Sequence, residues 1–278
     1  MATPDATLDP GRPRAHARLT APVRHLLEEF GDMMILAGKT ISSALRPPYP
    51  YGGEFVSQFL FAVQAVWFPL LVTTVAINYG APGLQAADFL SLFGALDRLG
   101  GFFVLAAIRE IGPLITSIVV AGVAGTAITA DLGARKIREE LDALQVLGVD
   151  PVKNLVVPRF LALMAVTGLF DIYSLLFGIF GGILAALVSG QPLGPFWGTL
   201  FANASTVDLW GSVLKTTCFG AIIAIVCSYK GMSASGGAEG VGRAVNEAVV
   251  VSFLGIGAFN YVFTQTLLAT HANILVIK

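Results

Sequence analysis

The stretch Ala130–Pro158, ADLGARKIREELDALQVLGVDPVKNLVVP, is a charged segment lying between two long apolar segments. It carries nine Asp, Glu, Lys and Arg side chains, and Arg159 follows directly. The whole chain is only 13% charged, against roughly 25% in an average globular protein. Each flanking apolar segment exceeds the roughly 20 residues that cross a bilayer. The stretch is therefore interpreted as a polar helix held between two membrane spans.

The helical pattern inside this stretch covers Gly133–Leu147, within a polar segment of about 131–148. Asp131 has the side chain of an N-cap, and Gly148 with Pro151 predicts the helix end. Charges spaced i, i+4 support a helix by a few tenths of a kcal/mol per pair. Three such pairs are present: Arg135–Glu139, Lys136–Glu140 and Arg138–Asp142. The apolar stripe consists of Ile137, Leu141, Leu144 and Leu147. This pattern alone fits either a docking site for a soluble protein or a solvated connector.

Composition predicts an integral membrane protein. The chain has 278 residues, is 55% apolar and has a mean hydropathy of +0.76. Its net charge of −1, without a basic patch beyond the N-terminal arginines, gives no indication of nucleic-acid binding. Cys218 and Cys227 are interpreted as apolar helix residues, because nine residues of helix separate them by about 13 Å. No catalytic triad or metal-ligand spacing is found, so neither catalytic nor metal-binding residues are assigned.

Apolar segments are expected to form five transmembrane helices in an all-α fold. Pro69 is expected to kink or split the first of them. Gly178 and Gly182 form a GxxxG pair, which lets another helix approach closely. The five expected spans are about Phe55–Ala87, Gly101–Ile128, Val156–Val188, Leu209–Tyr229 and Ala248–Ala269.

Two segments precede these spans. Residues 1–22 are rich in proline and arginine and are predicted to be a disordered cytosolic tail. In residues 23–45, apolar residues recur at helical spacing and charged residues fall on the opposite face. This pattern favours an amphipathic helix lying in the headgroup plane. A soluble helix packed on a partner is the alternative. The apolar face consists of Val23, Leu26, Leu27, Phe30, Met34, Ile41 and Leu45.

Lysine and arginine are distributed unevenly about the expected spans. The N-terminal segments, the charged stretch with Arg159, and the loop Lys230–Arg243 together hold 13 of the 17. Since cytoplasmic loops carry the excess of positive charge, these segments are expected to face the cytosol. Five spans then put the N-terminus in the cytosol and the C-terminus outside, in the plasma (inner) membrane.

Several charged residues lie inside expected spans, where charge is costly and by default marks a function. Arg109 and Glu110 lie in the second span and Lys215 in the fourth, at similar depths from the outer side. A Glu110–Lys215 pair is therefore geometrically possible. From the residues alone we expect them either to serve a function within the membrane or to form a purely structural ion pair. Asp171 in the third span is expected to serve helix packing.

Several motifs occur in the order in which they are found in the MlaE/YrbE permease family. They are REIGP (Arg109–Pro113), AGVAGTAITADLGA (Ala121–Ala134), EELDAL (Glu139–Leu144), GVDP (Gly148–Pro151) and VVPR (Val156–Arg159). The chain resembles this family over roughly residues 50–270, and residues 50–278 are taken as the permease domain. The later GG-x-x-GVG-x-AVNEAVV (Gly236–Val250) most resembles the A-type YrbE subunits of actinobacterial Mce transporters. Many MlaE members carry Arg where this chain has Val123, so a polar contact made by that arginine is absent here.

The resemblance implies a permease subunit of an ABC-type Mce lipid transporter, without catalytic activity of its own. It implies four kinds of partner: a B-type YrbE permease forming a heterodimer, a cytosolic ATPase dimer that binds ATP and Mg, MCE-domain proteins outside, and a lipid substrate. No cofactor is expected in this chain itself. The ATPase contact would fall on Glu139, Glu140, Asp142, Ala143 and Leu144, with Gly148 ending the helix. The substrate cavity or its bracing would fall on Arg109, Glu110, Asp208 and Lys215.

The function predicted from the sequence is thus the coupling of ATP hydrolysis in a partner to movement of a hydrophobic lipid across or out of the inner membrane. Two alternatives remain open. One is a non-transporting scaffold that only anchors MCE-domain proteins in the membrane. The other is an ion-coupled secondary transporter that uses the charges inside the spans as a relay.

Overall fold

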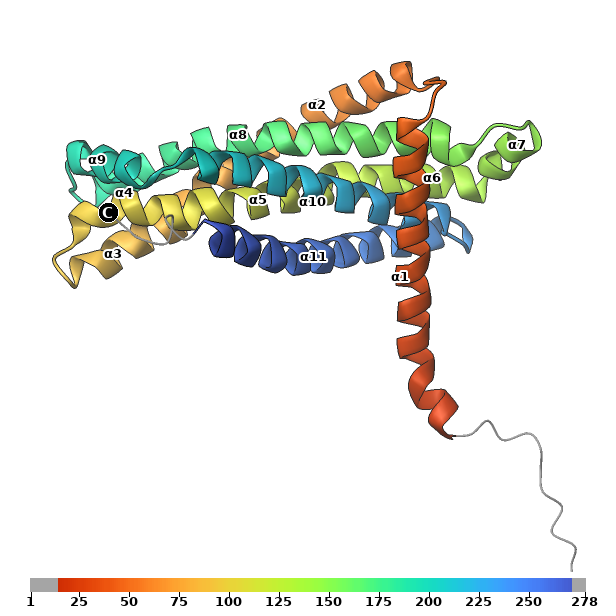
Figure 1. Ribbon diagram of the computed structural model, residues 1–278, viewed down its shortest axis with the longest axis horizontal. Helices are drawn as coiled ribbons and strands as arrows, with labels where there is room; N and C mark the ends of the chain where they lie inside the picture. The colour runs from red at the N-terminus through yellow and green to blue at the C-terminus, as the bar shows by residue number, and fades with distance from the viewer. Residues whose placement is uncertain (1–14, 272–278) are drawn as a thin grey trace, which may run out of the picture.

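A computed structural model describes residues 15–271, and helices account for nearly all of this range, without a strand (Figure 1). Five stretches of it are long and apolar enough to cross a bilayer, as the sequence predicts. Their bounds are Gly52–Ser91, Leu96–Ile137, Val152–Val188, Thr206–Met232 and Gly237–Thr270. The described protein is therefore an all-α bundle of five candidate membrane spans.

Several spans are built from more than one helical segment. The first comprises α2 (Gly52–Tyr79), the π-helical turn η1 (Gly80–Gln85) and α3 (Ala86–Ser91). The second comprises η2 (Leu96–Arg98), α4 (Leu99–Phe103), η3 (Val104–Ile111), α5 (Gly112–Val120), η4 (Ala121–Gly125) and α6 (Thr126–Ile137). The short α7 (Glu140–Val146) precedes η5 (Val152–Val156) and α8 (Val157–Val188), which make the third. After α9 (Leu193–Asn203), the fourth and fifth are α10 (Thr206–Met232) and α11 (Gly237–Thr270).

Prolines explain three of the four π-helical turns. Pro82 lies within η1, Pro113 follows η3, and Pro158 follows η5. Because proline lacks an N–H group, it removes one i to i−4 hydrogen bond, and the ladder is re-formed locally with wider spacing. Pro69 behaves differently, since α2 continues through it from Gly52 to Tyr79. Of the two outcomes expected from the sequence at Pro69, a kink or a split, the split is therefore wrong.

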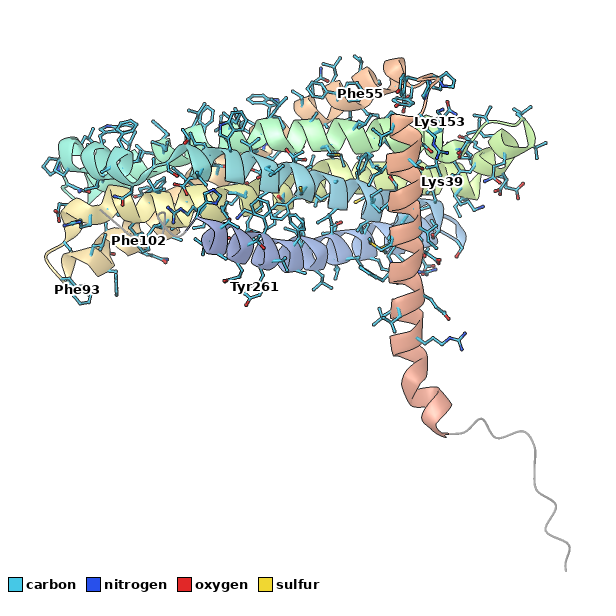
Figure 2. The ribbon with its side chains drawn as sticks, viewed as in Figure 1. Lys39, Phe55, Phe93, Phe102, Lys153 and Tyr261 are labelled. Carbon is cyan, nitrogen blue, oxygen red and sulfur yellow. The ribbon has the colours of Figure 1, made fainter. Side chains whose placement is uncertain are left out.

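The bundle has two distinct ends (Figure 1). At the α7 end lie α7, the turn between α10 and α11, and α1 (Ala15–Leu45), which crosses the bundle axis at a steep angle. At the α9 end lie α3, α4 and α9. Lys39 of α1 and Lys153 of η5 both lie where α1 meets the bundle (Figure 2). The segments that the sequence groups on one side of the membrane thus lie together at the α7 end.

The helix α1 begins at Ala15, so it includes residues 15–22 of the predicted tail, whereas residues 1–14 lie outside the described residues. Met33 and Leu36 are buried against the bundle. Lys39 pairs with Asp150 at 3.2 Å, and Lys230 of α10 pairs with Glu29. Most of the predicted apolar face points away from the bundle and is exposed: Leu26, Leu27, Phe30, Met34, Ile41 and Leu45. An exposed apolar face on a helix across the bundle end fits the predicted interfacial helix.

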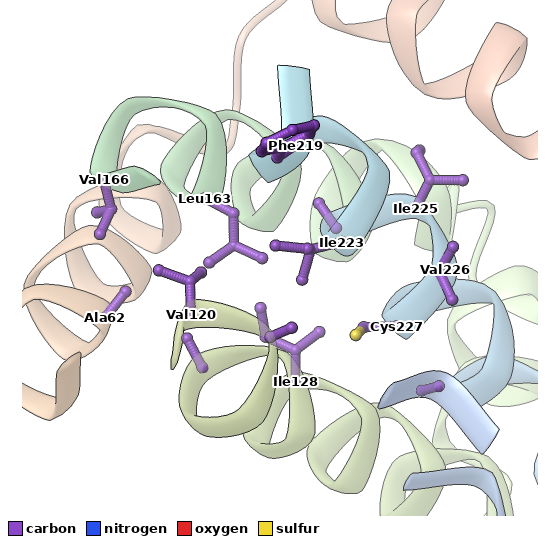
Figure 3. Packing of buried hydrophobic residues seen from close by; sticks show 14 of the residues in the cluster. Ala62, Val120, Ile128, Leu163, Val166, Phe219, Ile223, Ile225, Val226 and Cys227 are labelled. Atoms are coloured by element: carbon purple, nitrogen blue, oxygen red, sulfur yellow. The ribbon is translucent and has the colours of Figure 1, made fainter. Parts of the chain in front are cut away.

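The core lies around α8, which packs against α2 on one side and α10 on the other (Figure 3). Close approach of these helices requires glycine. A Cβ atom on Gly220 of α10 would lie 2.7 Å from the carbonyl oxygen of Leu163, and one on Gly181 of α8 would lie 2.7 Å from that of Val75. Gly181 lies between Gly178 and Gly182, the GxxxG pair that the sequence identifies. These glycines therefore allow α2 to contact the α8 backbone directly.

Candidate functional site

The four predicted cavity residues form one polar cluster near the α9 end of the bundle. Arg109 and Glu110 come from η3, and Asp208 and Lys215 from the first turns of α10. Arg109 Nε donates to Asp208 Oδ1 at 2.6 Å and its Nη2 donates to Oδ2 at 3.4 Å. Lys215 Nζ lies 3.5 Å from Glu110 Oε2. The pair that the sequence suggested as geometrically possible is present.

Asp208 has a second role as the N3 residue of a capping box. Its Oδ2 accepts hydrogen bonds from the backbone N–H and the hydroxyl of Ser205, at 3.0 and 2.8 Å, and its own N–H donates to Ser205 Oγ at 3.2 Å. The signal Ser-x-x-Asp before an apolar run was available in the sequence. The same carboxylate thus begins α10 and binds Arg109.

Lys215 and Glu110 connect η3 and α10 to α11. Lys215 Nζ donates to the carbonyl oxygen of Arg109 at 2.6 Å and to Thr264 Oγ1 at 3.3 Å. Glu110 accepts hydrogen bonds from Asn260 and Thr264, both at 2.8 Å. Asn260 and Thr264 were not identified from the sequence. Their i, i+4 spacing in an uncharged span was the signal, since it places both polar groups on one helix face.

The cluster encloses a cleft of only about 20 Å³. That is room for about one water molecule. The side chains of Asp208 and Lys215 are 1% and 4% exposed, whereas Glu110 is 33% exposed. Because its charges are paired and its cleft is too small for an acyl chain, the cluster in this chain holds three helical segments together.

Asp171 lies deeper in the bundle and is fully buried in α8. It faces α10 at Ser212 and Thr216 and is within electrostatic range of Lys215. The residue therefore lies at a contact between α8 and α10, as the sequence suggests.

The polar helix predicted within residues 131–148 is two helices with a break between them. α6 continues from the second span to Ile137, and α7 starts at Glu140. Glu139 between them has φ 59°, a left-handed conformation that is uncommon for a residue with a side chain. Asp131 therefore lies inside α6 and is not an N-cap. Gly148, with φ 77°, follows α7 and ends it as predicted.

The break changes the ion pairs. None of the three predicted i, i+4 pairs forms, because that spacing requires one continuous helix. Instead Arg138 Nε donates to Glu140 Oε1 at 2.7 Å, and this hydrogen bond holds the pKa of Glu140 below its usual range. Lys136 Nζ lies 3.1 Å from Asp142 Oδ1. Local geometry at Glu139 decides which charges meet.

The tip of α7 exposes apolar side chains. Of the predicted apolar stripe, Leu141 is buried, while Leu147 is 77% exposed and the neighbouring Val146 is 89% exposed. The predicted contact residues Glu139, Asp142 and Ala143 are exposed, and Glu140 and Leu144 are partly exposed. α7 therefore presents acidic groups next to an apolar tip.

Arg159 joins α6 to the start of α8 and α2, and it was not singled out as a site residue. Its side chain is 1% exposed, and Nη2 lies 2.6 Å from Asp131 Oδ2 and 3.3 Å from Glu54 Oε1. Nη1 donates to the carbonyl oxygen of Leu155 at 2.7 Å. The ends of α2, α6 and α8 thus meet at one guanidinium. An arginine at the start of an apolar span was the signal that the sequence offered.

Comparison with known proteins places the chain in a family. A family model described as Permease MlaE matches residues 55–266. A probable ABC transporter permease of Rickettsia typhi is 32% identical over 241 residues, covering 86% of this chain and 92% of the relative. The intermembrane phospholipid transport system permease MlaE of Haemophilus influenzae is 30% identical over 184 residues, covering 66% and 70%. The chloroplastic protein trigalactosyldiacylglycerol 1 of Arabidopsis thaliana is 34% identical over 183 residues, covering 66% and 52%. The chain belongs to the MlaE permease family and is a multi-pass membrane protein of the ABC transporter permease type.

Proposed function

We propose that this chain is the permease subunit of an ABC-type Mce lipid transporter in the inner membrane. In this proposal it couples ATP hydrolysis by a cytosolic ATPase dimer to the movement of a hydrophobic lipid. Membership of the MlaE family supports the proposal, as does the Haemophilus relative, which is named for phospholipid transport. The chain itself holds no cofactor, and ATP and Mg bind to the ATPase.

The observation that carries the proposal is the shape of α7. It projects from the bundle end with exposed Glu139 and Asp142 beside the apolar tip Val146–Leu147. Two large apolar side chains left more than three-quarters exposed beside charged groups are typical of a protein contact site. A connector whose only role is to keep the segment in solvent would not require two exposed apolar side chains. The ATPase therefore docks on α7.

Charge distribution supports the orientation. α1, α7 and the α10–α11 turn lie at one end of the bundle. Most of the lysine and arginine of the described residues lies in α1 or in the segments that adjoin α7 and this turn, 135–159 and 230–243. By the positive-inside rule this end faces the cytosol. The N-terminus is then cytosolic, the C-terminus is outside, and the Arg109–Asp208 cluster lies towards the outside, where MCE-domain proteins bind.

The lipid cavity lies between two permease chains. Within one chain, the cleft beside Lys215 holds about one water, and ligand pockets are typically ten or more times larger. Arg109, Glu110, Asp208 and Lys215 brace the helices that border this cavity. The second chain is a B-type permease, so that the assembly is a heterodimer.

Affinity purification of the full chain from its native membrane tests the proposal, with identification of bound proteins and lipids. We expect an ATPase, a second permease and MCE-domain proteins, with the ATPase lost from the double variant Glu139→Lys/Glu140→Lys. The matched control is Glu28→Lys/Glu239→Lys, which reverses two exposed charges at the same end of the bundle and is expected to keep the ATPase. Retention of the ATPase in both double variants would remove α7 as the docking site. ATPase activity indifferent to lipid in the purified complex would instead indicate a scaffold.

A further inference from the structure

A cleft of about 400 Å³ lies between α2, α6 and the start of α8, at the α7 end of the bundle. Its volume is in the range of pockets that hold small molecules. The cleft is open because α2 packs against α5 and η4 but makes little contact with α6, so that α2 leans away towards the α7 end (Figure 1). It is separate from the Arg109–Asp208 cluster, which lies near the α9 end.

One end of the cleft carries fixed charges of both signs. The buried Arg159 guanidinium contacts Glu54 and Asp131, so it fixes one carboxylate on α2 and another on α6. Arg135 lies one turn beyond Asp131 and donates to it through Nε at 3.2 Å. All four residues lie near the ends of candidate membrane spans, which is the level of the lipid headgroups.

Two of these charged groups keep unused hydrogen-bonding capacity. Arg135 donates through Nε only, and Glu140 lies 3.8 Å from its Nη1, too far for a hydrogen bond. The terminal N–H groups of this guanidinium are therefore available to an anion. Glu54 accepts from Gln58 through Oε1 at 3.0 Å, but no hydrogen bond among the described residues reaches its Oε2. The cleft thus offers donors to an anionic group and an acceptor to a cationic one.

Away from these charges the cleft is lined by apolar side chains. Phe61 lies seven residues beyond Glu54 along α2. Ala127 and Ile128 precede Arg135 on α6 by eight and seven residues. Both helices thereby carry the apolar lining about 10 Å from the charges, towards the middle of the bilayer. A cleft that is charged at the headgroup level and apolar below it matches an amphiphile with a zwitterionic head.

We propose that this cleft binds one zwitterionic phospholipid with a primary amine in its headgroup, from the leaflet at the α7 end. Arg135 binds the phosphate, because guanidinium groups hold phosphate oxygens through paired N–H donors. The ammonium group donates to Glu54, and an acyl chain lies along Phe61 between α2 and α6. A primary ammonium has the N–H donors that a quaternary amine lacks, so Glu54 favours the primary amine.

The site is formed by a single chain. It is therefore distinct from the cavity proposed between two permease chains, and lipid bound here is independent of an ATPase or a second permease. Binding of lipid by the isolated chain consequently tests this inference without testing the proposed function.

Native mass spectrometry of the purified full chain, incubated separately with dioleoyl phosphatidylethanolamine and dioleoyl phosphatidylcholine, tests the proposal. The wild type is expected to retain phosphatidylethanolamine in preference to phosphatidylcholine. Arg135→Gln is expected to weaken the binding of both lipids roughly tenfold, the equivalent of one charge-assisted hydrogen bond. Glu54→Gln is expected to remove the preference between them. The matched control is Arg243→Gln, which changes an exposed arginine at the same end, outside the cleft, and is expected to bind like the wild type.

A variant that keeps every charge guards against loss of folding in Arg135→Gln. Ser57 is exposed and lines the cleft, so Ser57→Phe is expected to fill the cleft and block the lipid. Equal phosphatidylethanolamine binding by the wild type, Arg135→Gln and Ser57→Phe would overturn the proposal, as would an undiminished preference in Glu54→Gln. A photo-crosslinking residue in place of Ser57 then identifies the occupant in the native membrane. Capture of phospholipid is expected, whereas capture of a protein chain alone would make the cleft a protein contact and refute lipid binding.

Discussion

The charged groups near the α9 end are buried and join distant parts of the chain, whereas those around α7 are exposed and join neighbours. Arg109 and Asp208 are 99 residues apart, and their side chains are 11% and 1% exposed. Arg138 and Glu140 are two residues apart and are 59% and 42% exposed. Exposed pairs contribute little to stability, whereas removing one partner of a buried pair is severe. The buried cluster therefore maintains the fold, and the exposed one remains available to another protein.

The largest effect is expected from breaking the buried pair. Asp208→Leu leaves Arg109 buried without its carboxylate and is expected to destabilise the chain by about 3–5 kcal/mol. Thermal unfolding of the purified protein measures this loss. The double variant Asp208→Leu/Arg109→Met is the control, and it is expected to recover much of the stability because no lone charge remains. A double variant no more stable than the single one would mean that the capping box at Ser205 dominates.

A smaller effect is expected at Arg159. It combines features of the two clusters just compared, because its own side chain is buried whereas its acidic partners are partly exposed. Arg159→Met removes a buried guanidinium, but its partners Asp131 and Glu54 are 40% and 35% exposed and become hydrated. We expect a loss of about 2 kcal/mol, the range of hydrogen bonds to charged groups. Arg159→Lys keeps the charge but lacks the forked guanidinium, so its stability is expected to lie between those of the wild type and Arg159→Met. Unfolding in denaturant distinguishes the three proteins, and equal stability of all three would contradict the role of Arg159 as a junction.

A smaller effect is expected at Glu139, the residue with a left-handed backbone between α6 and α7. There, glycine is expected to stabilise the chain relative to alanine. Glycine adopts φ 59° without the steric cost that other residues carry. Glu139→Gly is therefore expected to be more stable than Glu139→Ala by about 1 kcal/mol, since both lose the same carboxylate. Thermal unfolding of the two variants side by side measures the difference. If alanine were equally stable, the backbone at this position would be free to relax to a right-handed conformation.

The smallest effect concerns pH and the exposed pair Arg138–Glu140. Because Arg138 lowers the pKa of Glu140, the pair stabilises α7 above the usual glutamate pKa of about 4.3 and ceases to do so as the pH falls through the folded pKa. Hydrogen exchange of the α7 amides should therefore be slower in the wild type than in Arg138→Ala at about pH 6, with the two converging at about pH 3. Comparing both proteins at each pH cancels the intrinsic pH dependence of exchange. A difference that persists at low pH would assign the protection to something other than Glu140.

The same contrast explains what could be predicted from the sequence. The five spans follow from long apolar segments, and the ionised residues within them identify the buried cluster, since charge inside a span is rare enough to be informative. The hydrogen bonds of Glu110 to Asn260 and Thr264 were missed because neutral polar residues are common in spans. Their pairing depends on how α11 rotates against α10, which no local pattern encodes.

Around α7, by contrast, the charged residues did not predict which ion pairs form. The sequence located the charged segment and its end at Gly148, but it predicted one continuous helix. A single residue, Glu139, takes a left-handed conformation, and this changed every predicted ion pair. Helix propensities of Arg, Lys and Glu all favour continuation, so local preferences cannot reveal this break. Exposed charges exchange partners at little cost, and their geometry is correspondingly hard to predict.

The steep crossing of α1 over the bundle has a mechanical consequence. On the prediction that the exposed Phe30 and Ile41 place α1 in the headgroup plane, its ion pair with α10 through Glu29 and Lys230 would fix the height of the bundle in the bilayer. A bilayer that thickens or thins could then not be accommodated freely by tilting, because tilting would lift one end of α1 out of the interface. On that prediction, a change in membrane thickness acts on the bundle first through α10, the helix that carries Lys215.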